Sequence, residues 1–447
     1  MMNLAKTRVL VIGLRRSGMA AIKLLARHGA RINANDQASV AQLGPVLLEA
    51  SRYSEKIKAG GHKAEWFAQA DLIVVSPGVP LTAKEFDLAR KNEVPIVSEI
   101  ELASWFIATP ILAVTGTDGK STTTALTGEL LQSSGLSVFV GGNIGRPLSE
   151  LPLSGESYDI AVVELSSFQL EAIHDFHPRA TAITNLSLDH QDRYGSFEQY
   201  VSAKSNVFSN MGPDDAAILN ATDATVVHHY SHLPSPIQWF GDAHKPGAFI
   251  AGDILEIRTP KNNLSLGVEA FSLPGSHNRE NLMAASLLAL AGGATAEGLR
   301  KGIANFKGLP HRQENVGEPD GVLFINDSKA TSPGATATAI KAVDRPIILL
   351  MGGRDKGGDF AQLANLVADK VKLLMVFGEA AESIENALTN ATRVVRCMAL
   401  AEAIRLAHSE AVAGDAVVLS PGCASFDAFK SFEDRGNRFK EVVRALR

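Results

Sequence analysis

The chain has 447 residues, of which 45% are hydrophobic and 20% are charged, and its formal net charge is −5. This length is enough for about two to four domains, and the mild charge balance gives no indication of a nucleic-acid or anionic-membrane surface. The two cysteines, Cys397 and Cys423, lie far apart in the sequence, which argues against a disulfide framework and favours a reducing compartment. No apolar run approaches the ~18 residues of a membrane span, and the first residues do not resemble a signal peptide, so we expect a cytoplasmic protein without membrane insertion.

Short β-rich segments alternate with helix-like segments along nearly the whole chain. The β-rich segments are bounded by Gly, Pro or Asp and lack apolar–polar alternation, as expected for strands buried on both faces of a parallel sheet. Helix-like segments such as Met19–His28 and Leu282–Ala291 supply the crossovers, so the predicted fold class is α/β. In chain order, the predicted strands are Val9–Ile12, Leu72–Val75, Ile111–Val114, Ile160–Val163, Ala180–Thr184, Ile347–Met351, Leu374–Phe377 and Ala416–Leu419.

Breaks in this pattern near Val97–Glu99 and near Phe306–Leu309 predict three domains. Their ranges are 1–98, 99–306 and 307–447. Within the middle domain, Ser231–Gly267 is richer in Pro, His, Asn and Gly and has weak periodicity, which predicts loops or a small antiparallel patch.

The strongest local signal is a glycine-rich loop between the apolar strand Ile111–Val114 and a helical pattern, Thr123–Gln132. Glycines allow successive backbone N–H groups to turn toward a polyphosphate, and the helix N-terminus adds its dipole. The lysine of such a loop lies against the outer phosphates, and the following hydroxyl reaches Mg²⁺. The general pattern has four residues between its first Gly and the Gly-Lys pair, whereas here two residues intervene, so the loop is a shortened variant. It consists of Thr115-Gly116-Thr117-Asp118-Gly119-Lys120-Ser121-Thr122.

A second glycine-rich turn, Gly13–Gly18, resembles a dinucleotide-binding fingerprint but departs from it at one position. Arg15 replaces the glycine that lets the backbone approach a pyrophosphate, which disfavours a redox dinucleotide. Asp36 lies at the end of the next apparent strand, where a ribose-binding acid is expected. A nucleotide-diphosphate ligand held partly by side chains and a plain strand-to-helix turn both remain open.

Three further polar groups follow the strands of the middle domain. Glu164 follows one strand, the next strand is followed by Asp189–Tyr194, and Lys204 lies on a helical pattern beyond it. Alone, each is compatible with a solvated side chain. Because the carboxyl ends of parallel strands meet at one edge, together they predict a metal site and a charged floor for a transferring phosphoryl group.

In this order, the motifs resemble those of the Mur ligases, the family that adds amino acids stepwise to the bacterial cell-wall precursor. The resemblance spans essentially the whole chain. Within the family, the D-glutamate-adding branch is the most similar, on Ser76–Gly78 and on the C-terminal run from Ser420 to Asn437. The segments that carry the family resemblance are Thr115–Ser121, Gly141–Gly145, Glu164–Leu170, Asp189–Tyr194, Ala203–Lys204, Gly275–Asn278 with Asn281, Gly308–Arg312 and Asn326–Thr331.

The resemblance implies an ATP-dependent amide ligase that joins D-glutamate to UDP-N-acetylmuramoyl-L-alanine through an acyl phosphate, in peptidoglycan precursor synthesis. It implies a Rossmann-like first domain for the UDP substrate, a central P-loop-type ATPase domain and a Rossmann-like third domain for the amino acid. We expect a monomer that binds no nucleic acid.

The resemblance also implies a role for individual residues. The implied ATP-binding residues are Gly116, Thr117, Asp118, Gly119, Lys120, Ser121, Thr122, Asn278, Asn281, Arg312 and Asp327. Ser121, Glu164, His190 and Lys204 would organise two Mg²⁺ ions, with Lys204 carbamylated to a carboxylate-like group, and the catalytic set would be Lys120, Glu164, His190 and Lys204. The implied substrate-binding residues are Leu14, Arg15, Arg16, Ser17, Asp36, Ser76, Asn143 and Ser166, with Lys329, Thr331, Lys356, Ser425 and Phe432, the last five for D-glutamate.

Other functions remain to be weighed against this one. A folate polyglutamate ligase shares the central loop and the chemistry but not the first domain or the Ser420–Asn437 run. Another muramyl ligase, adding L-alanine or a diamino acid, differs mainly in its C-terminal pocket. A nucleotide switch gives His190 and Lys204 no role, and Arg15 disfavours a nicotinamide dehydrogenase.

Overall fold

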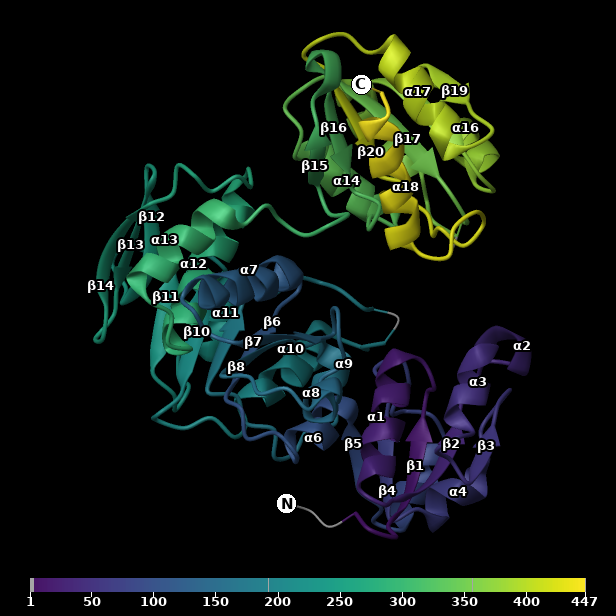
Figure 1. Ribbon diagram of the computed structural model, residues 1–447, viewed down its shortest axis with the longest axis vertical. Coiled ribbons are helices and arrows are strands. Elements are labelled where there is room, and N and C mark those ends of the chain that lie inside the picture. Colours follow the sequence, from purple (N-terminus) through teal and green to yellow (C-terminus); the bar gives the residue numbers. More distant parts are fainter. Residues whose placement is uncertain (1–3, 192, 356, 447) are drawn as a thin grey trace. The chain divides into compact units, whose positions relative to one another are not determined.

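The computed structural model describes residues 4–191, 193–355 and 357–446. They form a three-domain α/β architecture with three separate sheets that are mostly parallel, as predicted (Figure 1). By packing, the chain divides into two compact units, of which one contains the first and second sheets and the other contains the third. The first unit comprises Met1–Ser272 with Ser276–Phe306, and the second comprises Leu273–Gly275 with Lys307–Arg447.

The first sheet is parallel throughout, with strand order β3-β2-β1-β4-β5. The chain order reverses beside β1, so the loop after β1 lies where open α/β sheets bind ligands. The elements are β1 (Arg8–Ile12), α1 (Arg16–Arg27), β2 (Arg31–Asn35), α2 (Val40–Leu43), α3 (Pro45–Ala50), β3 (Lys56–Lys58), α4 (Ala64–Gln69), β4 (Leu72–Val75), α5 (Glu85–Lys91) and β5 (Ile96–Ser98).

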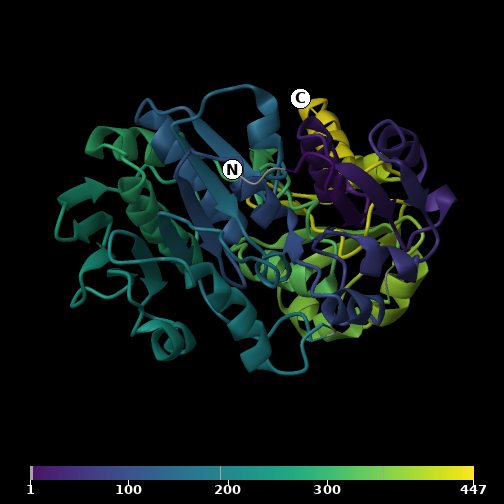
Figure 2. The ribbon, with the colours of Figure 1, turned by 90° about the horizontal axis from the view of Figure 1, so that it is seen from below.

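The central sheet has the order β14-β13-β12-β11-β10-β9-β6-β8-β7, with its strands also visible from below in Figure 2. Its strands from β12 to β14 pair antiparallel, and the others pair in parallel. The antiparallel patch predicted within Ser231–Gly267 is therefore confirmed. The strands are β6 (Ile111–Thr115), β7 (Val138–Gly142), β8 (Ile160–Glu164), β9 (Ala180–Ile183), β10 (Ala216–Asn220), β11 (Ile237–Phe240), β12 (Gly247–Ala251), β13 (Ile254–Arg258) and β14 (Asn263–Gly267).

Helices pack against the strands of this sheet, and α7 also packs against α12 and α13. The apolar residues of β6 and β8 are completely or almost completely buried, which explains why these strands lack alternation. The helices are α6 (Glu99–Ser104), α7 (Lys120–Ser133), α8 (Glu150–Ser154), α9 (Ser167–Leu170), α10 (Phe197–Ser205), α11 (Ala224–Tyr230), α12 (Ser276–Ala291) and α13 (Ala296–Asn305).

The third sheet belongs to the second unit and has the order β15-β16-β20-β17-β18-β19. The β15–β16 pair is antiparallel and the rest is parallel. The elements are β15 (Glu314–Gly317), β16 (Leu323–Asn326), α14 (Pro333–Lys341), β17 (Ile347–Gly352), α15 (Ala364–Lys370), β18 (Val371–Phe377), α16 (Ala381–Leu388), β19 (Val394–Arg396), α17 (Leu400–Glu410), β20 (Ala416–Leu419) and α18 (Phe432–Arg444).

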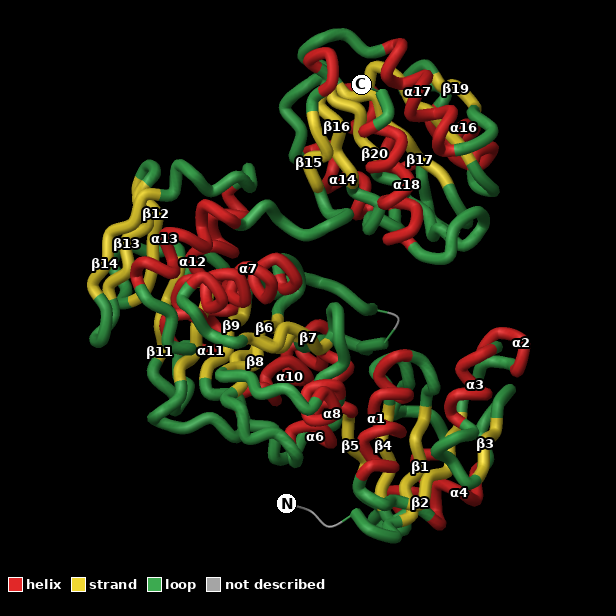
Figure 3. Tube along the Cα trace, viewed as in Figure 1, coloured by secondary structure: helices red, strands yellow, loops and turns green. Residues whose placement is uncertain are grey.

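Helices and strands alternate through all three domains (Figure 3). Each of the eight strands predicted from the sequence is present, with bounds that differ by at most a few residues. The predicted helices Met19–His28 and Leu282–Ala291 correspond to α1 and to the second part of α12. Throughout the described ranges, no helix combines the length and apolar character needed to cross a bilayer.

Candidate active site

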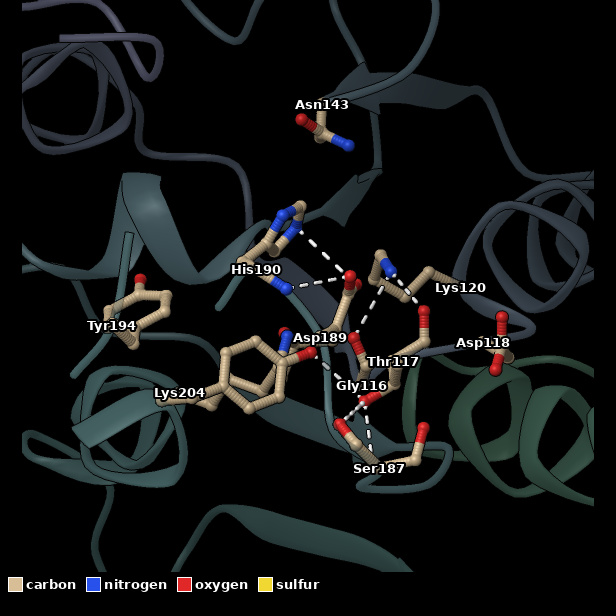
Figure 4. A network of polar contacts seen from close by, with 12 residues as sticks. Gly116, Thr117, Asp118, Lys120, Asn143, Ser187, Asp189, His190, Tyr194 and Lys204 are labelled. Carbon is tan, nitrogen blue, oxygen red and sulfur yellow. Dashed lines mark hydrogen bonds and ion pairs between the residues drawn. The ribbon is translucent and has the colours of Figure 1, made fainter. Parts of the chain in front are cut away.

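The carboxyl ends of four neighbouring parallel strands meet at one edge of the central sheet, where β9, β6, β8 and β7 lie side by side. The phosphate loop follows β6, Glu164 ends β8, Asn143 follows β7, and the loop with His190 lies between β9 and α10. Open α/β sheets bind ligands at such an edge. Figure 4 shows Lys120, Lys204 and the His190 loop gathered around Gly116 and Thr117.

Two glycines with left-handed backbone angles shape the phosphate loop. Gly116 has φ +137°, and a Cβ at this position would lie 2.0 Å from Thr184 Oγ1. Gly119 has φ +79° and caps α7, and a Cβ there would lie 2.3 Å from Asn281 Oδ1. The first-turn amides of a helix have no acceptor within the helix, so the N-terminus of α7 is suited to a phosphate group.

Asn185, which sequence reasoning did not single out, fastens this loop. Its backbone oxygen accepts a hydrogen bond from Thr117 N at 2.9 Å, and its Oδ1 accepts one from Asp118 N at 2.8 Å. Its Nδ2 and the hydroxyl of Thr184 both donate to Asp118 O, at 3.2 and 2.6 Å. The amides of Thr117 and Asp118 are thus engaged within the protein, which leaves the N-terminus of α7 as the part of the loop that is suited to a phosphate group.

Lys120 and Lys204 come from different helices and donate to the same acceptor. Their Nζ atoms lie 3.1 and 2.7 Å from the carbonyl oxygen of Gly116. Lys204 is only 2% exposed, and its Nζ lies 4.6 Å from the ring centroid of Tyr200. Burial, together with the nearby charge of Lys120, lowers the pKa of Lys204 to about 7. A lysine with this pKa is partly neutral near pH 7, so its amine is available for reaction.

Glu164 is a buried carboxylate with one oxygen satisfied and one not. Its Oε1 accepts a hydrogen bond from Asn143 Nδ2 at 2.7 Å, whereas Oε2 is buried and has no hydrogen-bond partner in the described structure. Leaving a buried carboxylate oxygen without a donor is costly, and a bound Mg²⁺ ion would satisfy it. Glu164 therefore fits the predicted metal role.

The described residues contain no group of three or more His, Cys, Asp or Glu side chains arranged to hold a metal. The predicted set has only two such residues, Glu164 and His190, and its other members are Ser121 and Lys204. Ser121 is 7% exposed in the first turn of α7, beside the phosphate loop. A carbamate on Lys204 would add the carboxylate oxygens that Mg²⁺ prefers.

His190 lies in the loop before α10 with φ +52°, a left-handed conformation that is uncommon for residues other than glycine. Its amide donates to Asp189 Oδ1 at 2.8 Å, and its Nε2 lies 3.5 Å from Asp189 Oδ2. Its ring lies against Phe168, with the two ring centroids 4.6 Å apart. Asp192, in the same predicted motif, lies outside the described residues.

Asn278 and Asn281, predicted to bind ATP, lie in the first turns of α12. Asn281 Oδ1 accepts a hydrogen bond from Thr123 Oγ1 of α7 at 3.1 Å, and its Nδ2 donates to Asn278 Oδ1 at 3.3 Å. The fold thus brings this pair to the phosphate loop, although about 160 residues separate them in the sequence.

In the first domain, Asp36 holds the predicted substrate loop together. Its Oδ2 accepts a hydrogen bond from Leu14 N and its Oδ1 accepts one from Ala38 N, both at 2.7 Å. Arg15 and Arg16 at the start of α1 are exposed, and Ser17 is partly buried. Leu14 is fully buried, so its side chain belongs to the core and its backbone is what a ligand at this loop would meet.

Two predicted substrate serines have local structural partners. Ser76 donates its hydroxyl to Gly13 O at 2.9 Å, which ties the loop after β4 to the loop after β1. Ser166 accepts a hydrogen bond from Gln169 N at 3.3 Å, and the Gln169 side chain accepts one in return from Ser166 N, so the pair forms a capping box at the start of α9.

In the second unit, Asp327 is 5% exposed at the end of β16. Its carboxylate accepts hydrogen bonds from Gln313 N at 3.2 Å and from Ser420 Oγ at 3.1 Å. Burial raises the pKa of Asp327 to about 7, while the charges of Arg312 and Lys329 oppose this rise. The predicted residues Arg312, Asp327 and Lys329 are therefore close enough to interact electrostatically.

The residues predicted to receive D-glutamate come from separate loops of this unit. Ser425 is 2% exposed, whereas Thr331 and Phe432 are partly buried. The carbonyl oxygen of Phe432 accepts a hydrogen bond from Ser328 Oγ at 2.8 Å, which places the start of α18 beside the loop after β16. Lys356 lies outside the described residues.

Arg435 is a completely buried cation that joins these loops. Its guanidinium donates to the carbonyl oxygens of Ser328, Gly352 and Cys423 at 2.9, 3.2 and 3.1 Å. Burial lowers the pKa of Arg435 to about 10. The sequence placed this residue in the C-terminal motif but gave it no role, because nothing in the motif reveals that three distant loops meet on it.

The chain is similar to known proteins over nearly its whole length. Family models match at residues 7–98 (Mur ligase MurD-like, N-terminal domain), 114–289 (Mur ligase middle domain) and 311–423 (Mur ligase, glutamate ligase domain). The UDP-N-acetylmuramoylalanine--D-glutamate ligase of Geotalea daltonii is 41% identical over 447 residues, covering 100% of this chain and 99% of that protein. The chain belongs to the Mur ligase family. A protein of the same name from Trichlorobacter lovleyi is 42% identical over 450 residues, with both chains covered completely.

Solved structures of other family members share the fold. UDP-N-acetylmuramate-alanine ligase MurC from Thermotoga maritima has a TM-score of 0.58 at 21% identity and covers 99% of this chain and 100% of its own. MurF from Acinetobacter baumannii has a TM-score of 0.60 at 17% identity and covers 98% and 93%. At these identities the similarity establishes the three-domain α/β fold.

Proposed function

We propose that this chain is an ATP-dependent ligase that adds D-glutamate to UDP-N-acetylmuramoyl-L-alanine. The observation that carries the chemistry is the arrangement at the phosphate loop, where Lys120 and the buried Lys204 converge on Gly116 O beside the half-satisfied Glu164. The substrates follow from the curated relatives, which bear this name and align over the full chain.

The reaction proceeds in two steps. An oxygen of the alanyl carboxylate attacks the γ-phosphorus of ATP, the bond to the β–γ bridging oxygen breaks, and ADP leaves. The amine of D-glutamate then attacks the acyl carbon, the bond to the phosphate oxygen breaks, and inorganic phosphate and a proton are released. Phosphorylation is needed because a free carboxylate has no adequate leaving group. The α7 N-terminus and Lys120 stabilise charge on the transferring phosphoryl group.

Mg²⁺ is the implied cofactor, and it would neutralise charge on the phosphate oxygens. Ser121, Glu164 and His190 would hold two such ions, with Lys204 as a carbamate. Carbamylation joins the neutral Lys204 amine to CO₂, and one proton is lost. The low exposure of Lys204 and its position next to Gly116 O support this modification, because the N–H that remains can still donate to Gly116 O.

Each domain has one principal ligand in this proposal, although Arg312 and Asp327 of residues 307–447 are also among the implied ATP-binding residues. Residues 1–98 hold the UDP moiety through the backbone of the Leu14–Ser17 loop and the Ser76 turn, and Asn143 reaches the substrate from the central domain. Residues 99–306 bind ATP. Residues 307–447 bind D-glutamate through Lys329, Thr331, Lys356, Ser425 and Phe432. We further propose that the enzyme is a cytoplasmic monomer, which light scattering and cell fractionation test directly.

The decisive experiment measures phosphate release from ATP with UDP-N-acetylmuramoyl-L-alanine and one of four amino acids. We expect turnover with D-glutamate and none with L-glutamate, L-alanine or meso-diaminopimelate. Turnover with another amino acid would assign a different specificity within the family. The Lys120→Met variant is the control, and we expect it to release no phosphate because the outer phosphates lose their cationic partner.

A further inference from the structure

A polar cluster with no part in the proposed reaction lies beside the His190 loop. Arg193 Nη2 lies 2.6 Å from Glu171 Oε2 and Arg193 Nε lies 3.3 Å from Glu171 Oε1, so the pair is bidentate. The two side chains are only 13% and 16% exposed. Tyr194 donates its hydroxyl to the same Glu171 Oε1 at 2.6 Å. One carboxylate therefore holds two consecutive residues of the loop.

This cluster contacts His190 through both backbone and side chain. The carbonyl oxygen of His190 accepts hydrogen bonds from Arg193 N at 2.9 Å and from Tyr194 N at 3.0 Å. The Arg193 guanidinium lies 4.9 Å from the ring centroid of Phe168, and Phe168 is the ring against which the His190 imidazole lies. The left-handed backbone of His190 is an unfavourable conformation that persists only where surrounding contacts enforce it.

The same arginine also reaches the first domain. Arg193 Nη2 donates to the carbonyl oxygen of Val79 at 3.1 Å. Val79 closes the turn that begins at Ser76, since Val79 N donates to Ser76 O at 3.0 Å, and Ser76 in turn bonds Gly13 of the predicted substrate loop. The Arg193 guanidinium thus contacts the Ser76–Val79 turn of the first domain and, in the central domain, Glu171 and the Phe168 ring that lies against His190.

We propose that Glu171 and Arg193 are positioning residues that orient His190 and match its placement to that of the Ser76–Val79 turn. The proposal rests on the proposed function, because it assumes that His190 helps to hold the Mg²⁺ ions of that reaction. Only a planar guanidinium satisfies Glu171 in a fork, donates to Val79 O and stacks on Phe168 at the same time. A lysine keeps the charge but cannot make all three contacts.

The Arg193→Lys variant tests this. We expect kcat to fall about 10- to 100-fold, the usual effect of losing an outer partner of a metal-site residue, with a smaller change in the KM for ATP. The matched control is Arg27→Lys. Arg27 Nη1 donates at 2.9 Å to Pro152 O, so it also joins residues 1–98 to residues 99–306, but it does not contact the His190 loop. We expect its kcat to equal that of the wild type.

Phe168→Leu removes the ring between Arg193 and His190 while keeping an apolar side chain. If Arg193 acts through Phe168, the double variant loses no more activity than the stronger single variant. Additive losses, or equal kcat values for Arg193→Lys and Arg27→Lys, would overturn the proposal.

An NMR measurement separates this proposal from the assigned reaction. The imidazole resonance of His190, identified by its absence in His190→Asn, should move in Arg193→Lys and stay in place in Arg27→Lys. This readout needs no turnover. If the wild type has no ligase activity but the His190 resonance moves in Arg193→Lys, the proposed reaction is refuted and the positioning role is supported. If the wild type is active but the resonance does not move, the reaction is supported and the positioning role is refuted.

Discussion

Replacing Gly119 with alanine separates the two constraints that act on the phosphate loop. The left-handed φ of +79° costs an alanine about 1–2 kcal/mol. The added Cβ would also stand 2.3 Å from Asn281 Oδ1, so Asn281 must move and its hydrogen bond from Thr123 is lost, at about 1 kcal/mol. We therefore expect Gly119→Ala to lose about 2–3 kcal/mol of stability.

The functional loss should be larger than this strain alone implies. When Asn281 and the cap of α7 shift, the enzyme loses at least one charge-assisted hydrogen bond to phosphate, which contributes about 1.5–3 kcal/mol. The Kd for a non-hydrolysable ATP analogue should then rise about 10- to 100-fold. Isothermal titration calorimetry measures this Kd, and thermal unfolding followed by circular dichroism measures the accompanying loss of stability.

Gly135 provides a control at the other end of the same helix. It has φ +88°, and a Cβ there meets no atom within 4 Å. Gly135→Ala should therefore carry the conformational cost of about 1–2 kcal/mol and bind the analogue with unchanged affinity. Equal analogue affinities for Gly119→Ala and the wild type would refute the placement of phosphate at the α7 N-terminus. Equal losses in both variants would attribute the effect to the helix as a whole.

Three further predictions follow from single contacts. Asn185→Ala keeps the backbone contact to Thr117 N but releases the amide of Asp118 and removes one donor to Asp118 O, so the ATP analogue should bind about tenfold more weakly by calorimetry, and an unchanged Kd would show that the loop is rigid without these side-chain bonds. Protein equilibrated with ¹³C-bicarbonate should give a carbamate NMR signal that Lys204→Arg abolishes, and a signal that survives in the variant would locate the carbamate elsewhere. Burial raises the pKa of Glu99 from 4.5 to about 7, so between these pH values the folded protein keeps a proton that the unfolded chain has released. The free energy of unfolding therefore has its full contribution from Glu99 below pH 4.5 and loses it as the pH rises through about 7. Thermal melts of Glu99→Gln should show a smaller decline across this range, and parallel curves would remove Glu99 as the cause.

Much of the fold could be predicted because its main determinant is local. A continuous apolar run such as Ile111–Val114, ended by a glycine, is compatible with few structures other than a strand buried on both faces. Strands with mixed composition were not predicted. β2 contains Arg31, Asn33 and Asn35, and β3 is the three-residue segment Lys56–Lys58, so neither has the continuous apolar run of a predicted strand such as β6.

The candidate site could be predicted only in part, because its partners are distant in the sequence. Asn185 Oδ1 contacts an amide 67 residues away, and no local pattern distinguishes this asparagine from a turn residue. Asp36 shows a different limit. Its position after β2 indicated a ligand-binding acid, and that role stays a prediction; in the structure both of its oxygens bond backbone amides, so its observed role is to shape the loop at Leu14.

The shortened phosphate loop and Asn185 are two parts of one arrangement. A longer loop can turn more of its own amides toward a polyphosphate, whereas here the amides of Thr117 and Asp118 are directed to Asn185. The loop has fewer amides free for a phosphate, but it is held more rigidly. Asn185 accepts a hydrogen bond from Asp118 N, and Thr184 and Asn185 both donate to Asp118 O. In the proposed reaction, the charge that those amides would have countered must be met by other groups, and the two lysines that share Gly116 O are suited to that role. If Lys204 becomes a carbamate, Lys120, the α7 N-terminus and the implied Mg²⁺ ions would balance this charge, and the half-satisfied Glu164 would help to hold the metal.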